Sequence, residues 1–323
     1  MQARDATLAR RMKARGLGAL ALLACVLAPW PLLADSARSA GPARRIVSIN
    51  LCTDQILVHL VGRDRIAALS HLARDSQLSP VVADAAGIAS VHGSAEEVLA
   101  LAPDLVLTAE YSTPQVVALL NRLGVRVEVV PLASDLEGIR VAIRRVAAAV
   151  GEPERGDELI RAFDARLDAV RPGGGARPTA LAYQVNSLSA GAGGLIDAML
   201  NTAGFLNMAS EMKLGPAGRV PLESFIARPP DLVVLANAPD AFRSVSADNL
   251  RHPALRDQMR RRPHAELGMP LWLCGSPAVA GGRGRLVAAG AAIAGSVGAA
   301  GTQDTANVPA RLDLHASPAR AMP

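Results

Sequence analysis

Short β-branched runs alternate with segments of helical spacing along most of this chain from Arg44 onward. The runs RRIVSIN, DRIAALS, DLVLTAE and VRVEVVP are typical of strands, and the segments TDQILVHLVG, EEVLALA and PQVVALLNRLG between them have helical periodicity. Alternation of this kind predicts a mostly parallel sheet flanked by helices. Ligands of such sheets bind beyond the carboxyl ends of the strands, so the residues that follow each strand are the first candidates for a site.

The alternation is interrupted once, which divides the chain of 323 residues into two lobes. Between about residues 135 and 170 the pattern is helical without strands, and after the loop RPGGGARP it resumes with TALAYQ, LIDAMLNTAG, FIARPP, DLVVLAN and MPLWLCG. We therefore predict the α/β class, with two Rossmann-like lobes of mostly parallel sheet, one long linking helix and a ligand cleft between the lobes. The expected ranges are 44–150 for the first lobe, 151–172 for the linking helix, 176–296 for the second lobe and 297–323 for a disordered tail.

An internal repeat indicates that the two lobes are built alike. The segment EEVLALAPDLVL begins at Glu96, and ESFIARPPDLVV begins at Glu223, 127 residues further along, with six identities in twelve positions. Both read as a short helix, then Pro-Asp, then a strand. Two lobes of similar construction leave a cleft between them.

The N-terminus has the three-part plan of a secretory signal, which we assign to residues 1–36. The first 15 residues are basic, residues 16–34 carry no charge, and small residues follow. This predicts export to the periplasm, with lipid anchoring at Cys25 as the alternative. After the signal only Cys52 and Cys274 remain, and in an exported protein they form either a disulfide or two buried thiols.

Charge and motifs exclude several classes of function. The formal net charge is +5 and most of it lies in the leader, while aromatic residues are only 2% of the chain, so a nucleic-acid-binding surface is not expected. The phosphate-loop, dinucleotide-binding, nucleophile-elbow and zinc-protease motifs are absent, and no two histidines have metal-pair spacing. The rival functions are an exported enzyme with an anion site at GAGGLID (191–197) and a metal chaperone.

Five side chains follow predicted strands and therefore face the predicted cleft: His71, His92, Tyr111, Tyr183 and Trp272. In a chain with few aromatics, such placement favours a ligand-binding role, because rigid and partly polar rings add affinity in a cleft. The alternative is that the histidines are solvated loop residues and that the aromatic rings cap the ends of the sheets.

Glu96 and Glu223 occupy equivalent positions of the repeat. Each acid in the first turn of a helix complements the helix dipole, and Ser94 with Glu97 also forms a capping-box pattern. As a matched pair, Glu96 and Glu223 instead suit a partner with two basic sockets. We expect the pair to serve docking.

The segments RRIVSINLCTDQILVHLVGRDRIAALSH and GSAEEVLALAPDLVL resemble the class III periplasmic binding proteins of ABC importers, which serve vitamin B12, ferric siderophores and haem. The similarity runs from about Arg44 to Leu286. It implies a non-catalytic, monomeric binding protein that captures a metal chelate, cobalamin or a ferric siderophore, and delivers it to an ABC permease in the inner membrane. Haem binding and metal-ion binding are the alternatives.

The resemblance also assigns roles to residues. Members of the family have docking glutamates, one per lobe, and these correspond to Glu96 and Glu223. The ligand would contact Tyr111, Tyr183 and Trp272, with Asn50, Cys52, His71 and His92 nearby, and for haem the axial ligand would be Tyr111 or a cleft histidine. Where the family has a Ser-Pro-Ser type of turn, this chain has Asn50-Leu51-Cys52, and a Cys52–Cys274 disulfide across the cleft is a hypothesis.

Overall fold

The computed structural model describes residues 42–112, 114–236, 247–300 and 311–312, without the side chains of residues 296–300 and 311–312. The expected signal segment 1–36, with Cys25, lies outside the described residues. Among the helices of the described residues, none combines the length and the apolarity needed to cross a membrane.

The first lobe is a parallel five-stranded sheet in the order β3-β2-β1-β4-β5. Its strands are β1 (Ile46–Ser48), β2 (Ile66–Ser70), β3 (Ser90–Val91), β4 (Leu105–Ala109) and β5 (Val127–Val130). Its helices are α1 (Leu51–Leu60), α2 (Val82–Ala85), α3 (Ala95–Ala100), α4 (Pro114–Arg122) and α5 (Leu136–Val150), with 3-10 turns η1 (Arg63–Arg65) and η2 (His71–Arg74). All the pairings in this sheet are parallel, as the alternation predicted.

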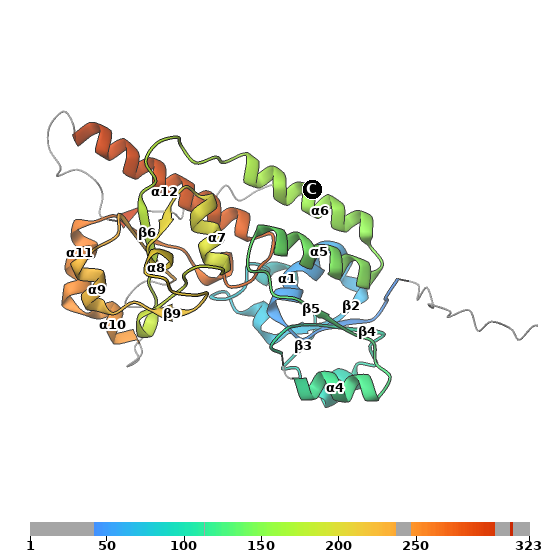
Figure 1. Ribbon diagram of the computed structural model, residues 1–323. Helices are drawn as coiled ribbons and strands as arrows, with labels where there is room; N and C mark the ends of the chain where they lie inside the picture. Colours follow the sequence, from blue (N-terminus) through green and yellow to red (C-terminus); the bar gives the residue numbers. More distant parts are fainter. Residues whose placement is uncertain (1–41, 113, 237–246, 301–310, 313–323) are drawn as a thin grey trace, which may run out of the picture. The chain divides into compact units, whose positions relative to one another are not determined.

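The second lobe is a parallel five-stranded sheet in the order β12-β11-β10-β6-β8, with a separate antiparallel pair β7-β9. Its strands are β6 (Thr179–Ala182), β7 (Leu188–Ser189), β8 (Leu206–Asn207), β9 (Gly218–Arg219), β10 (Leu232–Leu235), β11 (His264–Glu266) and β12 (Arg311–Leu312). Its helices are α7 (Leu195–Thr202), α8 (Met208–Glu211), α9 (Leu222–Ala227), α10 (Asp248–Arg251), α11 (Pro253–Arg261) and α12 (Val279–Ala300), with 3-10 turns η3 (Val185–Ser187) and η5 (Met269–Leu271). The predicted α/β class with two lobes is confirmed (Figure 1).

The two lobes share one construction, as the repeat indicated. In the first lobe, Asp104 precedes β4 and accepts hydrogen bonds from the backbone N–H groups of Arg44 (2.7 Å) and Arg45 (3.1 Å), just before β1. In the second lobe, Asp231 precedes β10 and accepts from the N–H (2.7 Å) and hydroxyl (2.8 Å) of Thr179, which begins β6. The Asp of each Pro-Asp pair thus fixes the register of its strand against the neighbouring parallel strand.

The helical region between the lobes consists of two helices. The interior face of α5 is buried in the first lobe, and α5 ends at Gly151, whose left-handed φ of 78° turns the chain at Glu152 into α6 (Pro153–Asp168). Helix α6 packs on both α5 and α12, so it links the lobes (Figure 1). It is shorter than the expected 151–172.

The C-terminal part of the second lobe differs from two expectations. MPLWLCG was expected to be a strand, but its first residues form the 3-10 turn η5, and Pro270 has no N–H to donate to a sheet. The strand that pairs with β10 is His264–Glu266. Of the expected tail 297–323, residues up to Ala300 continue α12, and Arg311–Leu312 form the edge strand β12. Residues 301–310 and 313–323 lie outside the described residues.

Candidate ligand-binding site

Four of the predicted site residues follow four adjacent strands of the first sheet. Asn50 follows β1, His71 follows β2, His92 follows β3 and Tyr111 follows β4. Because these strands are parallel and their order is β3-β2-β1-β4, the four residues form a row along the carboxyl edge of the sheet. We call these four residues the edge row.

His71 and His92 form a stacked pair at one end of the edge row. Their ring centroids are 4.6 Å apart with an interplanar angle of 25°. The Nδ1 atom of His92 lies 3.2 Å from Oε1 of Glu97, which is also the capping-box acid of α3. The hydrogen bond to His92 and the backbone hydrogen bond from Ser94 lower the pKa of Glu97. A charged Glu97 therefore holds the exposed His92 ring in place.

Asn50 and Tyr111 differ in what they leave available to a ligand. The Asn50 side chain caps α1, since its Oδ1 accepts from the N–H of Cys52 (2.8 Å) and its Nδ2 donates to Ser112 Oγ (3.2 Å). Tyr111 is 92% exposed and has a φ of 65°, a backbone conformation that is uncommon for a residue other than glycine. The neighbouring turn thus presents the Tyr111 ring and phenol to solvent.

The structure places Tyr183 and Trp272 in the interior of the second lobe, which corrects the expectation that they line the cleft. Tyr183 is fully buried, donates its hydroxyl hydrogen to Ser187 Oγ (3.0 Å) and packs against Phe225, with ring centroids 5.5 Å apart. Trp272 is buried in one apolar cluster with Leu286 of α12. Both rings therefore serve as core side chains of the second lobe, in a chain that has few aromatic residues.

The hypothesis of a disulfide between the lobes is confirmed, because Cys52 and Cys274 are bonded to each other. Cys52 is in the first turn of α1, and Cys274 follows η5 in the second lobe. Beside it, Ser276 Oγ donates to Oε1 of Gln55 (2.6 Å), and a Cβ on Gly275 would lie 2.3 Å from Cβ of Ala133. Cys52 is therefore part of the junction between the lobes rather than a free thiol for a ligand.

A buried polar cluster under the edge row was missed by the sequence analysis. Asp54 of α1 is fully buried and accepts hydrogen bonds from the backbone N–H (3.3 Å) and the hydroxyl (2.5 Å) of Ser70. Burial raises the pKa of Asp54 to about 7, against the lowering effect of hydrogen bonds from Ser48 and Ser70. The signal in the sequence was the serine at the end of each of two apolar strands, Ser48 and Ser70.

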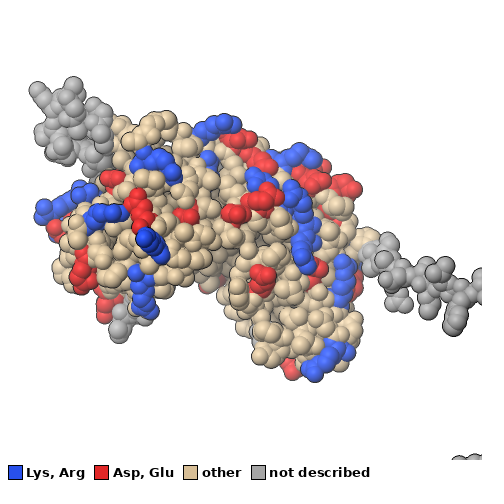
Figure 2. Space-filling view, viewed as in Figure 1, with Lys and Arg blue, Asp and Glu red and all other residues tan. Residues whose placement is uncertain are grey.

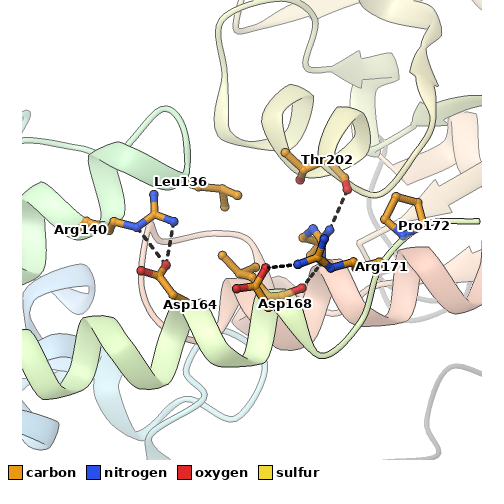
Figure 3. A pocket seen from close by; sticks show the side chains of 9 residues that line it. Leu136, Arg140, Asp164, Asp168, Arg171, Pro172 and Thr202 are labelled. Carbon is orange, nitrogen blue, oxygen red and sulfur yellow. Dashed lines mark hydrogen bonds and ion pairs between the residues drawn. The ribbon is translucent and has the colours of Figure 1, made fainter.

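A cavity of about 660 Å³ lies away from the edge row, between α5, α6, α7 and α12 (Figure 3). Its charged side chains are paired with one another, Arg140 with Asp164 (2.7 Å) and Arg171 with Asp168 (3.2 Å). The buried Arg283 donates to the carbonyl groups of Leu167, Val170 and Thr202 at 2.7–3.0 Å, joining the end of α6 to α7. Burial lowers the pKa of Arg283. We interpret this cavity as part of the helical link rather than as the chelate site.

Glu96 and Glu223 are both exposed in the first turns of their helices, α3 and α9. Within the described residues, no hydrogen bond or ion pair is found for either carboxylate. The capping role in the first lobe belongs to Glu97, which leaves Glu96 available to a partner. On the face drawn in Figure 2, acidic and basic side chains are interspersed, so this face has no extended surface of one charge.

The rival sites receive no support from their surroundings. At GAGGLID, Gly191 lies against the carbonyl of Leu214, and Oδ1 of Asp197 at the start of α7 accepts hydrogen bonds from Asn207 (2.9 Å) and Ser210 (2.6 Å). Asp197 thus places a negative charge in the first turn of α7, which disfavours a bound anion there. Among the described residues, no three His, Cys, Asp or Glu side chains converge as metal ligands.

The disulfide predicts a large loss of stability when it is removed. Replacing both cysteines (Cys52→Ser with Cys274→Ser) should lower the free energy of unfolding by about 3–5 kcal/mol, because the bond closes a loop of more than 200 residues in the unfolded chain. Denaturant unfolding of the two proteins measures the difference. As a control, alkylation of the unreduced mature protein should modify neither cysteine, and two alkylated thiols would contradict the bond.

Asp54 predicts that stability falls as pH rises. The folded protein holds a proton on Asp54 up to about pH 7, whereas the unfolded chain loses it near 3.8, so the native state binds more protons in this window. This group should therefore cost about 3 kcal/mol of stability between pH 5 and pH 8. Asp54→Asn, which resembles the protonated acid, should remove that slope in urea unfolding. Asp157→Asn, at an exposed site on α6, should keep it, and an equal slope in all three proteins would contradict the assignment.

Comparison with known proteins agrees with this architecture. The sequence matches the profile of the family described as "Periplasmic binding protein" over residues 46–260. No curated protein matches the sequence in a direct search.

Solved structures share the fold at low identity. The apo periplasmic haem-binding protein RhuT of Roseiflexus sp. RS-1 superposes with a TM-score of 0.63 at 22% identity, covering 78% of this chain and 99% of that one. A periplasmic haem-binding protein from Pseudomonas aeruginosa gives 0.61 at 24% identity, covering 76% and 92%. The periplasmic vitamin B12-binding protein BtuF of Vibrio cholerae gives 0.56 at 15% identity, covering 78% and 98%.

The profile match spans the first lobe, the linking helix and the second lobe as far as α11. This chain therefore belongs to the periplasmic binding protein family.

Proposed function

We propose that this protein is the substrate-binding component of an ABC importer and that it captures a metal chelate at the edge row. The observation that carries the proposal is the row itself, in which a stacked histidine pair, an asparagine and an exposed tyrosine follow four adjacent parallel strands. With strands about 4.8 Å apart, the row extends about 14 Å from β3 to β4. A planar macrocycle has a comparable width.

Among metal chelates, the exposed Tyr111 phenol favours haem. Phenolate and imidazole are both known axial ligands of haem iron, and the edge row offers both groups, Tyr111 at one end and the histidine pair at the other. Two exposed apolar side chains, Leu132 after β5 and Leu273 beside Cys274, supply apolar surface near the carboxyl edge for a ring. Of the three solved structures named above, two are described as haem-binding and one as vitamin B12-binding, so cobalamin and ferric siderophores are the alternatives that the test must separate.

We further propose that the protein acts as a monomer in the periplasm. The basic and then apolar leader at residues 1–36 supports export, with lipid anchoring at Cys25 as the variant of that route. The Cys52–Cys274 bond supports the same location, because disulfides persist in oxidising compartments.

Delivery to the permease would use Glu96 and Glu223. Each is an exposed acid at the same position of the repeated helix, without a partner among the described residues. Two matched carboxylates on separate lobes fit two arginine sockets of a permease dimer.

Haem binding by Tyr111 predicts a spectroscopic change that depends on one hydroxyl group. Haem added to the mature protein should give a saturable Soret band, and Tyr111→Phe should shift this band and weaken binding by about tenfold or more, because the phenolate ligand is lost. Tyr183→Phe is the matched control, since it changes the only other tyrosine, which is buried, and should leave the spectrum unchanged.

Cyanocobalamin and a panel of ferric siderophores, titrated in parallel by calorimetry, separate the alternatives. Saturable binding of one of these instead of haem would retain the binding function and reject the haem assignment. A haem complex with the same spectrum in Tyr111→Phe would reject Tyr111 as the ligand.

The docking acids predict a loss of transport without a loss of binding. Glu96→Ala combined with Glu223→Ala should reduce chelate uptake by more than about tenfold, because two charge pairs with the permease are lost, while the chelate affinity of the isolated protein is unchanged. Uptake in cells and calorimetry measure the two quantities. Glu154→Ala with Glu158→Ala, two exposed acids on α6, should leave both unchanged. A fall in chelate affinity in the first double variant would contradict the division between edge row and docking acids.

A further inference from the structure

A second cavity, of about 230 Å³, lies at the junction of the two lobes. Its wall comes from three parts of the chain: the first lobe (α1, α2 and the preceding loop), the linking helix α6, and residues 271–278 of the second lobe. None of its lining residues belongs to the edge row. We call it the junction cavity.

The side-chain amide of Gln55 is a buried polar group of the junction cavity. This residue is 1% exposed, and its Oε1 accepts the hydrogen bond from Ser276 Oγ across the junction. Its Nε2 has no hydrogen-bond partner among the described residues. A buried N–H donor without an acceptor costs free energy, so such groups in native proteins have a partner supplied by water or a ligand.

A second donor and a compensating acid lie on the same wall. Arg166 of α6 lines the cavity from its exposed side, and no ion pair or hydrogen bond of its guanidinium is found within the described residues. Asp84 of α2 lines it as well. His59 is one helical turn after Gln55 on α1. Burial lowers the pKa of His59; the charge of Asp84 raises this pKa to a smaller extent, and the charge of Arg166 lowers it. At neutral pH the wall therefore carries one positive charge, one negative charge and a neutral imidazole.

We propose that the junction cavity binds a small monocarboxylate. A carboxylate can accept a hydrogen bond from Gln55 Nε2 and a charge-assisted hydrogen bond from the Arg166 guanidinium. A single neutral water would give Arg166 only a weaker, uncharged acceptor. Asp84 on the same wall disfavours a second negative charge, which selects against dicarboxylates and phosphate. Val81, Leu271 and Pro277 form an apolar part of the wall that suits a short alkyl chain.

A ligand in this cavity would contact both lobes and the linking helix at once. It would therefore stabilise the junction beside the Cys52–Cys274 bond in the arrangement seen here. The inference does not depend on which chelate binds at the edge row.

Sodium butyrate is the probe for this site. In two-dimensional NMR spectra of the ¹⁵N-labelled mature protein, the side-chain amide of Gln55, assigned by its disappearance in Gln55→Met, should shift saturably with butyrate. n-Butylamine, which has the same chain and the opposite charge, should not shift it. Arg166→Gln should weaken butyrate binding by about tenfold or more, since one charge-assisted contact is lost.

Arg161→Gln is the matched control, because Arg161 is exposed on the same helix and does not line the cavity. It should bind butyrate as the unchanged protein does. The proposal is overturned if the Gln55 amide does not respond to butyrate, if n-butylamine gives the same shift, or if Arg166→Gln and Arg161→Gln bind butyrate equally well.

Discussion

A carboxylate holds the central strand pair of each sheet in register, and the position of the site follows from this. Asp104 bonds the backbone just before β1, and Asp231 bonds the first residue of β6. With the starts of the parallel strands fixed, their carboxyl ends lie at the same edge of the sheet. In the first lobe this edge carries the edge row, and directly below it lies Asp54 with its serine partners. A change in register at β1 or β4 would move these side chains to different heights or to opposite faces of the sheet.

The fold was predictable from the sequence because its signals are local and repeated. Alternating strand and helix patterns predicted the parallel sheets, and the repeat at Glu96 and Glu223 predicted two lobes of like construction. The prediction failed at MPLWLCG, where an apolar run has strand composition but contains Pro270 and packs as a 3-10 turn beneath α12. Composition indicates that such a segment is buried, and only its neighbours determine its backbone conformation.

The positions of the candidate site residues were predictable in part, for the same reason. His71, His92 and Tyr111 were expected at the carboxyl edge of the sheet because they follow strands, which is a local property. Tyr183 follows a strand as well but packs inward on Phe225, and nothing in the sequence around it distinguishes the two outcomes. The Cys52–Cys274 pairing, the raised pKa of Asp54 and the unpartnered amide of Gln55 depend on contacts between distant segments. Such properties require the tertiary structure.

On the export route proposed above, the long-range disulfide also sets the order of translocation and oxidation. Cys52 and Cys274 are 222 positions apart, so the residues between them must leave the translocation machinery before the bond can form. On that route Cys25 would leave with the leader, and the two remaining cysteines would have a single possible intramolecular pairing. Oxidation would then need no disulfide isomerase, since there would be no mispaired monomer to correct. An oxidase alone would suffice to form this bond.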